Sequence, residues 1–289
     1  MHNVHGFMRS DVAVYIPVYN GMPYLEECLT AVFAQSYAFS EVIIIDDCST
    51  DGLNEWMREQ TAFSVRYVRL PVRSGIAAVR NKGIYETKTP FLASIDVDCV
   101  IEKDWLSRLM GHFADDTVVG AGGVLIEKKH TAFADQWRTV HMTQQIAFHT
   151  TDVPFLPGCN AVYRRDVLRE IGGYRDDYRY HHEDTDAGER LYARGWRLRY
   201  DITVPVRHIK HDTVTSVMRS CWGFRHRMPL CSWRQLVKEC LFEHMRGVKL
   251  FWHDLISGRY RIALAVDLRY GWYQSYFSWQ SYRYRHCNF

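Results

Sequence analysis

The sequence predicts an α/β protein with a mixed, mostly parallel sheet flanked by helices, followed by a helical C-terminal extension. Short apolar runs alternate with helical patterns through about the first 113 residues. Several of these runs are apolar at every position, as in strands that helices cover on both faces. Beyond residue 215 the alternation gives way to a segment rich in basic and aromatic residues.

The length and composition are those of a globular protein. The 289 residues are 47% hydrophobic and 24% charged, which excludes a disordered chain. The formal charge of +3 is unevenly spread: residues 216–289 hold 12 Lys/Arg and 4 Asp/Glu, whereas residues 1–215 hold 24 and 29. Residues 216–289 also hold 16 of the 41 aromatics. We therefore expect a main domain at residues 9–215 and a basic, aromatic, mostly helical extension at residues 216–289.

The sequence shows no pattern of a secreted or membrane-spanning protein. The eight cysteines stand singly and form no CxxC pair, as reduced cysteines in a cytosolic protein do. The first residues lack the charged-then-apolar layout of a signal peptide. The nearest apolar run, residues 262–266, ends at Asp267, well short of the ~18–20 residues of a membrane span. We expect a cytoplasmic protein, either soluble or associated with a membrane surface.

Strands and helices alternate in the first part of the chain. Strands are expected at residues 12–16, 42–45, 65–70 and 91–95, where apolar and β-branched residues run together. Helices are expected around residues 23–33, 76–86 and 105–113, where apolar residues recur at helical spacing. After residue 122 the pattern becomes mixed, and a long polar and aromatic helix is expected at residues 133–148.

Each of the first four strands is followed by a segment with polar side chains. These segments are Pro17-Val18-Tyr19-Asn20-Gly21, Asp46-Asp47, the run from Arg73 to Asn81, and Asp96-Val97-Asp98. The carboxyl ends of parallel strands share one edge of a sheet, where ligands bind. Asp96 and Asp98 repel one another unless a cation or a donor-rich ligand lies between them. The alternative for Asp46, Asp47 and Asp51 is that they only cap the next helix.

Four strings that follow one another at ordinary spacing carry a family resemblance: PVYNG, VIIIDDCSTDG, GIAAVRNKGI and FLASIDVDCVIEKDWL. Together they resemble the inverting family 2 glycosyltransferases of GT-A fold, over about three-quarters of the chain. The resemblance implies a nucleotide-binding half at about residues 9–122 and an acceptor half at about residues 123–215. It implies transfer of a sugar from a nucleotide-sugar donor, expected to be a UDP-sugar, to a hydroxyl of a glycan, lipid-linked or peptide acceptor.

The resemblance also implies roles on the donor side. The nucleotide pocket is expected to be lined by Pro17, Tyr19 and Asn20. Asp47 is expected to accept the uracil N–H, and Arg80 to contact the nucleotide. Asp96 is expected to bind ribose or metal, and Asp98 to bind the metal. Cys99 stands where many relatives have a third acid. The metal site is therefore expected to depend more on Asp96 and Asp98.

On the acceptor side, Glu183-Asp184 resembles the family's Glu-Asp pair before a helix. Inverting transfer needs a base that takes the proton of the attacking hydroxyl, and a carboxylate near other acids has a raised pKa. We expect Asp184 to be this base, with Glu183 orienting the acceptor or the base. The alternative is that both acids only favour a helix N-terminus. His181 and His182 are candidates for acceptor contacts.

A histidine after the next strand is implied to complete the metal shell. His208 fits this position best, and His211 is the alternate. Imidazole, carboxylates and diphosphate oxygens together suit Mn²⁺ or Mg²⁺. Such an ion would neutralise the leaving nucleoside diphosphate.

The role of residues 216–289 stays open between three interpretations. Their rings pack against the main domain, or meet a membrane surface, or form an oligomer contact. Arg219, Arg225 and Arg227 are also candidates for the donor diphosphate. No nucleic-acid-binding module is present, and no nucleic acid partner is expected.

Two other functions compete with glycosyl transfer. A nucleotidyltransferase on a related scaffold would also use paired acids and a metal, but it would show a Gly-rich basic loop after the first strand, which PVYNG is not. A non-catalytic sugar-nucleotide-binding protein is disfavoured by the complete set of acids.

Overall fold

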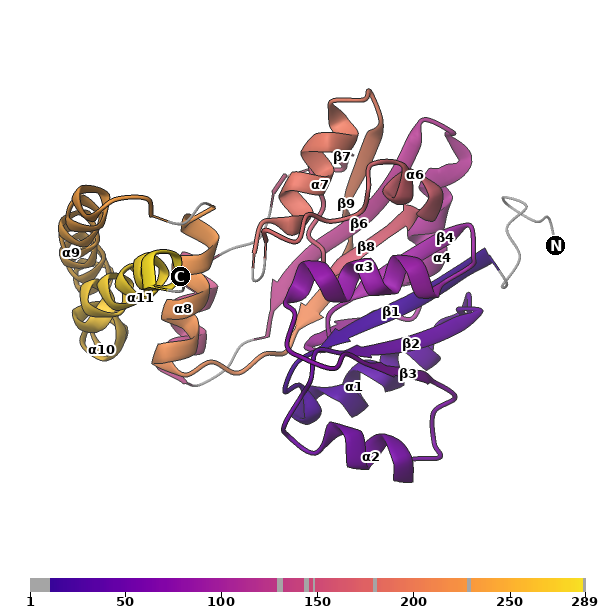
Figure 1. Cartoon of the computed structure of the whole chain (residues 1–289), viewed down its shortest axis with the longest axis horizontal. Helices are drawn as coiled ribbons and strands as arrows, with labels where there is room; N and C mark the ends of the chain where they lie inside the picture. The colour runs from indigo at the N-terminus through magenta and orange to yellow at the C-terminus, as the bar shows by residue number, and fades with distance from the viewer. Residues whose placement is uncertain are drawn as a thin grey trace. The chain divides into compact units, whose positions relative to one another are not determined.

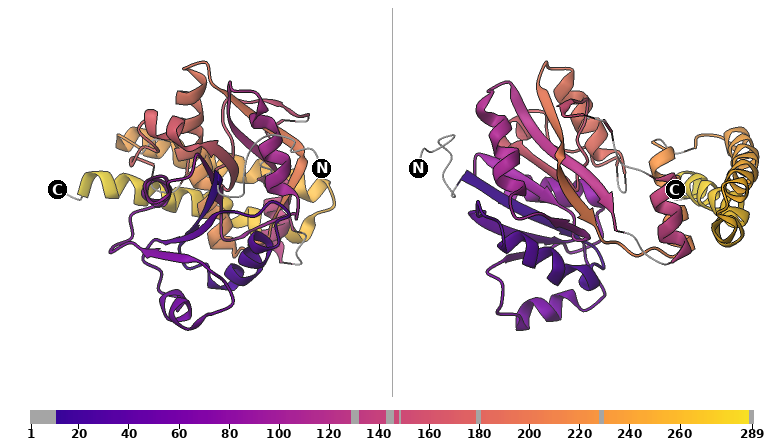
Figure 2. Two further views of the ribbon diagram at one scale, coloured as in Figure 1. Left: turned by 90° about the vertical axis from the view of Figure 1, so that its right-hand side faces the viewer. Right: turned by 180° about the vertical axis from the view of Figure 1, so that it is seen from behind.

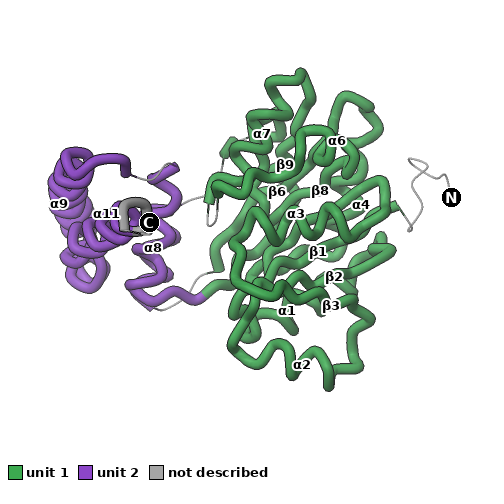
Figure 3. Tube along the Cα trace, viewed as in Figure 1, with its two compact units in different colours: residues 1–128, 144–210 green, residues 129–143, 211–289 purple. Residues whose placement is uncertain are grey.

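The computed structural model describes residues 11–128, 132–142, 146–147, 149–178, 181–227 and 230–287. The chain divides into two compact units (Figure 3). Unit 1 contains residues 1–128 and 144–210, and unit 2 contains residues 129–143 and 211–289. Unit 2 therefore combines the C-terminal helices with a segment from the middle of the chain.

Unit 1 is built on a mixed sheet with the strand order β3-β2-β1-β4-β8-β6-β9-β5, and β7 pairs with β9 (Figure 1). Four neighbouring strands are parallel: β1 (Val12–Val18), β2 (Glu41–Asp46), β3 (Arg66–Arg69) and β4 (Phe91–Ile95). The remaining strands are β5 (Cys99–Ile101), β6 (Val118–Glu127), β7 (Thr151–Asp152), β8 (Asn160–Arg164) and β9 (Arg197–His208). Strand β8 is antiparallel to β4 and β6, whereas β9 is parallel to β6. The predicted α/β fold is confirmed.

Helices cover both faces of this sheet (Figures 1 and 2). One face packs against α1 (Met22–Phe33), α2 (Leu53–Glu59) and α4 (Trp105–Met110), which a short 3-10 turn (Gly111–Ala114) follows. The other face packs against α3 (Ile76–Glu86), α6 (Arg165–Glu170) and α7 (Glu183–Tyr192). Side chains alternate across β1: Val14 and Ile16 join the first core, and Ala13 and Tyr15 join the second. This double coverage explains why β1 is apolar throughout.

Unit 2 is helical. It comprises α5 (Phe133–His141), α8 (Val214–Arg225), α9 (Trp233–Ile256), α10 (Tyr260–Ile262), a π-helical turn (Ala263–Asp267) and α11 (Leu268–Cys287). Trp137, Met218 and Tyr270 share its core. Reciprocal side-chain caps begin two helices, at Thr213 for α8 and at Ser232 for α9. The predicted helical extension is therefore present.

The expected helix over residues 133–148 was wrong in its length. Helix α5 ends at His141, and Met142 leaves the helical conformation with φ −128° and ψ 40°. Helix α5 belongs to unit 2 and the described residues 146–147 belong to unit 1, so the helix ends before the chain passes from one unit to the other. Part of the expected range, residues 143–145 and 148, lies outside the described residues.

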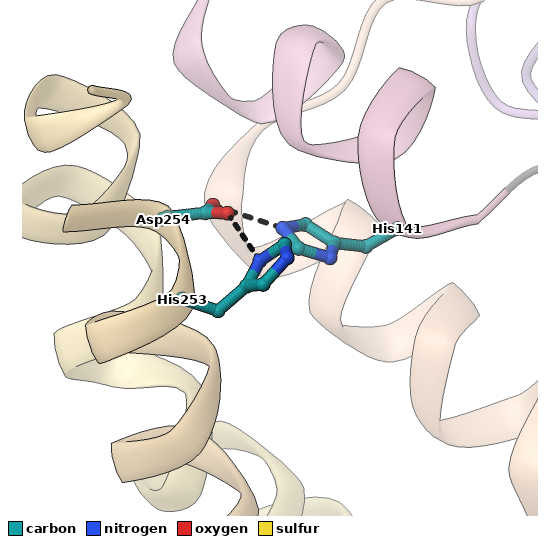
Figure 4. Close-up of side chains that lie close together, drawn as sticks. All are labelled: His141, His253 and Asp254. Atoms are coloured by element: carbon teal, nitrogen blue, oxygen red, sulfur yellow. Dashed lines mark hydrogen bonds and ion pairs between the residues drawn. The ribbon is translucent and has the colours of Figure 1, made fainter. Parts of the chain in front are cut away.

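Buried Asp254 fastens α5 to α9 inside unit 2 (Figure 4). Its Oδ2 lies 2.9 Å from His141 Nε2, and its Oδ1 lies 3.1 Å from His253 Nδ1. Arg259 donates to the same Oδ1 from Nε and Nη2 at 3.0 and 2.8 Å. No helix among the described residues is long and apolar enough to span a membrane.

Candidate active site

The two adjacent aspartates at the end of β2 have different partners. Asp46 is fully buried and accepts hydrogen bonds from Tyr67 Oη and Arg69 Nη1, both at 2.6 Å. Asp47 accepts from the backbone N–H groups of Ser74 at 2.6 Å and Gly75 at 2.9 Å. Asp46 thus holds β2 against β3, whereas Asp47 holds the loop that leads into α3.

The end of β1 presents Tyr19 and Asn20 beside this loop. Tyr19 is 40% exposed, and the guanidinium carbon of Arg73 lies 3.9 Å from its ring centroid. Asn20 adopts a positive φ of 52°, and its Oδ1 accepts from the Thr50 N–H at 2.8 Å. Pro17 is buried within β1 opposite Ile45, so its place in a pocket wall stays a prediction.

Arg80 on α3 connects the acids expected on the donor side with those expected on the acceptor side. Its side chain is 3% exposed, and its guanidinium donates from Nε to Glu183 Oε1 at 3.0 Å and from Nη2 to Asp96 Oδ1 at 3.1 Å. Its Nη1 donates to Ser94 Oγ at 2.6 Å and to the Gly158 carbonyl at 2.7 Å. One buried cation therefore joins the end of β4, the start of α7 and the loop before β8.

The acids of this network have raised pKa values, mainly because burial disfavours their charged forms. Burial and the neighbouring Asp184 raise the pKa of Glu183 to about 7, although Arg80 opposes the shift. Burial also raises the pKa of Asp96, again against the effect of Arg80. The carboxylates next to Arg80 thus hold a proton more readily than ordinary surface acids.

Asp184 is only half-buried, unlike Glu183. Its Oδ2 accepts from the Gly158 N–H at 2.9 Å, and its Oδ1 accepts from the Thr185 N–H at 2.7 Å. Because Gly158 also accepts from Arg80, one residue connects both members of the Glu-Asp pair to the strand-end acids. His182, the residue directly before α7, has φ 73°.

A second group of side chains lies where β6 and β9 end and β5 begins. His208 Nε2 is 3.4 Å from Asp98 Oδ2, and His208 Nδ1 is 2.7 Å from Glu127 Oε2. The strand registers place Cys99 and Glu127 opposite His208. Burial alone would lower the pKa of His208, but Asp98 and Glu127 raise it to about 10. The two predicted metal ligands, Asp98 and His208, thus lie together, and Glu127 lies next to His208.

These residues fit a divalent cation. A carboxylate behind a metal-binding histidine orients the ring and raises its basicity, and Glu127 stands in this relation to His208. Glu127 Oε1 is buried and has no hydrogen-bond partner in the described part of the chain. The sequence analysis missed Glu127. Like Asp96, Glu127 is an acid at the end of an apolar strand, and this pattern could have identified it. The alternate ligand, His211, belongs to unit 2, where its Nδ1 lies 3.2 Å from Asp135.

Comparison with known proteins identifies the family. The model of glycosyl transferase family 2 matches residues 13–172, more than half of the chain. The chain therefore belongs to glycosyltransferase family 2, and the resemblance drawn from its motifs is confirmed.

Curated relatives are similar over much of this chain. It is 28% identical over 220 residues to the pre-mycofactocin glycosyltransferase of Mycobacterium tuberculosis. The matched region covers 73% of this chain and 45% of that protein. It is 30% identical over 203 residues to the glycosyltransferase AglE of Haloferax volcanii. The matched region covers 62% of this chain and 63% of that protein. The chain thus spans less than two thirds of the length of these relatives.

Solved structures share the fold. The mannosyltransferase PcManGT from Pyrobaculum calidifontis, in complex with GDP-Man and Mn²⁺, has a TM-score of 0.57 at 21% identity and covers 75% of this chain and 62% of its own. Residues 1–349 of S. aureus TarS, in complex with UDP-GlcNAc, have a TM-score of 0.55 at 14% identity and cover 96% of this chain and 93% of their own. Together with the observed sheet, these likenesses confirm the GT-A fold.

Proposed function

We propose that the protein transfers a sugar from a nucleotide-sugar donor, expected to be a UDP-sugar, to a hydroxyl acceptor with inversion. The observation that carries this proposal is the Arg80 bridge between Asp96 and Glu183. Arg80 joins two sets of acids in one network. The strand-end acids are expected to meet the donor, and the Glu-Asp pair is expected to meet the acceptor. The nucleotide sugars named with two fold neighbours support this donor class.

In this proposal Asp184 is the general base. Two backbone N–H groups hold its carboxylate, and the side chain is only half-buried, so an acceptor hydroxyl has access to it. Asp184 would take the hydroxyl proton as the oxygen attacks the anomeric carbon from the face opposite the diphosphate. Glu183 is buried and forms an ion pair with Arg80, and we assign it the role of positioning Asp184.

Asp98 and His208 are the proposed ligands of a divalent cation, Mn²⁺ or Mg²⁺, with Glu127 orienting His208. When bound, the ion would neutralise charge on the leaving nucleoside diphosphate. Asp47, Tyr19 and Asn20 are proposed to hold the nucleotide at the ends of β1 and β2, with Pro17 beneath them. Arg80 already donates four hydrogen bonds to groups within the protein. We therefore propose that it positions Asp96 rather than acting mainly on the nucleotide.

The test is release of UDP from a panel of UDP-sugars with hydroxyl acceptors. We expect Asp184→Asn to lower kcat by at least about 100-fold because the base is lost. UDP should still raise the melting temperature of this variant, since the donor site is intact. EDTA should abolish transfer, and Mn²⁺ should restore it.

Asp166→Asn is the matched control, because Asp166 is an exposed aspartate near the start of α6. It should leave kcat unchanged. Full transfer by Asp184→Asn would remove Asp184 as the base. Release of pyrophosphate from a nucleoside triphosphate and a sugar phosphate would favour the nucleotidyltransferase instead.

We further propose that unit 2 binds an anionic membrane surface. Large apolar side chains are exposed at helical spacing along α9 and α11: Leu241, Met245, Val248, Trp252 and Ile256 on the first, and Leu268, Trp272, Tyr276 and Trp279 on the second. Three of the four acids in residues 216–289, Glu243, Asp254 and Asp267, are buried. The surface is therefore basic and aromatic, the composition that suits a lipid headgroup region.

A further inference from the structure

A polar cluster in unit 2 contains His226, Glu239 and Glu243. His226 directly follows α8, and the two glutamates lie one turn apart on the same face of α9. One nitrogen or oxygen atom from each residue lies within 4.8 Å of the others. None of these residues takes part in the proposed transfer reaction.

The hydrogen bonds of His226 leave one ring nitrogen facing an acid. Nδ1 lies 2.8 Å from the carbonyl oxygen of Trp222, which can only accept, so Nδ1 carries the hydrogen. Nε2 lies 2.8 Å from Glu239 Oε1. If the imidazole is neutral, its lone pair faces a carboxylate oxygen at this distance. A second proton or a cation must therefore lie between them.

Glu243 adds an unsatisfied acid to the same place. Its side chain is fully buried, and its Oε1 accepts from Arg225 Nη1. Its Oε2 has no hydrogen-bond partner in the part of the chain that the structure describes. Arg225 supplies one positive charge against the two carboxylates of Glu239 and Glu243. Buried oxygens of this kind are normally paired, so with a neutral His226 the cluster is short of one positive charge.

We propose that His226 Nε2, a carboxylate oxygen of Glu239 and Oε2 of Glu243 bind a divalent transition metal. One nitrogen and two carboxylate oxygens suit Zn²⁺, Co²⁺ or Mn²⁺. The Trp222 carbonyl holds the histidine ring in the tautomer that such a site needs. Glu239 is the most exposed of the three side chains, at 25%, and provides the route for the ion. The ion fastens the end of α8 to α9 and is separate from the proposed site at Asp98.

The cluster of His141, His253 and Asp254 offers similar groups but lacks the charge deficit (Figure 4). Both oxygens of Asp254 already face nitrogen donors, and Arg259 pairs with Oδ1. Arg259 Nη2 also lies 3.3 Å from His253 Nδ1, where a metal ion would meet its positive charge. This cluster therefore serves as the control.

Titration of the full-length chain with Co²⁺ after chelator treatment tests the proposal, read by visible absorption and by melting temperature. The Asp98→Asn background weakens binding at the proposed catalytic site. We expect this variant to bind one Co²⁺ and to melt at a higher temperature with it. Adding Glu239→Gln should weaken Co²⁺ binding at least about 10-fold and abolish the rise in melting temperature.

His253→Ala in the same background should bind Co²⁺ as before. Should Glu239→Gln fail to fold by circular dichroism, His226→Gln gives the same comparison. Absence of Co²⁺ and Zn²⁺ binding in Asp98→Asn overturns the proposal, because a shared proton then supplies the missing charge. Loss of binding in His253→Ala but not in Glu239→Gln also overturns it.

Discussion

Arg80 is buried and makes four hydrogen bonds to groups from three different parts of unit 1. Its planar fork reaches Asp96 and Glu183 at once, which a lysine ammonium cannot do. A buried carboxylate without its cation is costly, so the fold and the site share this residue.

We expect Arg80→Lys to lower the free energy of unfolding by about 3 kcal/mol, because it breaks a buried ion-pair network. Urea denaturation measures this change. Lys82→Met on the same helix is the control: Lys82 forms an ion pair with Glu86 and is 39% exposed, so its loss should cost no more than about 0.5 kcal/mol. Equal effects of the two substitutions would contradict the role given to Arg80.

Asp267 in unit 2 makes stability depend on pH. Burial, with a further contribution from Asp254, raises its pKa from 3.8 to about 7, and the Trp137 Nε1–H bond at 2.7 Å only partly offsets this. The folded protein then holds a proton that the unfolded chain releases above pH 3.8. Stability contributed by this group should therefore fall as pH rises from about 4 to 7 and level off above 7.

Asp267→Asn should remove this fall, because asparagine keeps the acceptor for Trp137 and does not titrate. Between pH 5 and 7 the wild type should lose up to about 1.4 kcal/mol per pH unit relative to the variant. Urea denaturation at several pH values measures the difference. Identical pH profiles would show that Asp267 is already ionised in the folded protein.

Among the elements, the pair β6–β9 sets the geometry of the proposed metal site. The register shifts between Gly123 and Val124, and this irregularity brings Glu127 opposite His208. A Cβ on Gly123 would lie 1.9 Å from the Val204 carbonyl oxygen, so only glycine permits the close approach of the strands there.

Gly123→Ala should lower the free energy of unfolding by at least about 2 kcal/mol, because the strands must separate to admit the methyl group. Gly111→Ala is the matched control, since nothing lies within 4 Å of its added carbon, and we expect a change within about 0.5 kcal/mol. Thermal unfolding compares the two. A tolerated Gly123→Ala would mean that the register at Glu127 does not depend on this contact.

The elements also show what sequence patterns could predict. Residues 42–45 were recognisable as a strand because both faces are covered, so every position is apolar. The end of α5 was not recognisable, because it depends on where the chain leaves unit 2 rather than on local preference. Glu127 was missed for a related reason: its contact with His208 spans 81 residues and depends on strand register.

At the scale of the whole molecule, unit 1 contains the proposed transfer site and unit 2 contains the exposed apolar stripes. Residues 216–289 have a formal charge of +8 from 12 basic and 4 acidic residues. Most of the acids are buried, so the positive charge lies towards solvent. In the proposed membrane binding, electrostatic attraction to anionic lipid and insertion of tryptophan rings would act together.

We expect the protein to sediment with vesicles that contain phosphatidylglycerol, and less so at high salt, because salt screens the attraction. Trp252→Ser with Trp272→Ser should reduce binding, since both rings are more than half exposed. Tyr85→Ser in unit 1 removes an equally exposed ring and should change nothing. Equal sedimentation with and without vesicles would refute the membrane proposal and favour an oligomer contact or a further protein segment.

The sequence by itself determined the alternation of strands and helices, the family, and the candidate acids Asp47, Asp98 and Asp184. These follow from local patterns, because an apolar run and the polar residues at its end are neighbours in the chain. Only the tertiary structure decided that α5 belongs with the C-terminal helices, that Glu127 stands behind His208, and that Arg80 is buried between Asp96 and Glu183. Such contacts join residues far apart in sequence, and they exist only once packing and strand register bring those segments together.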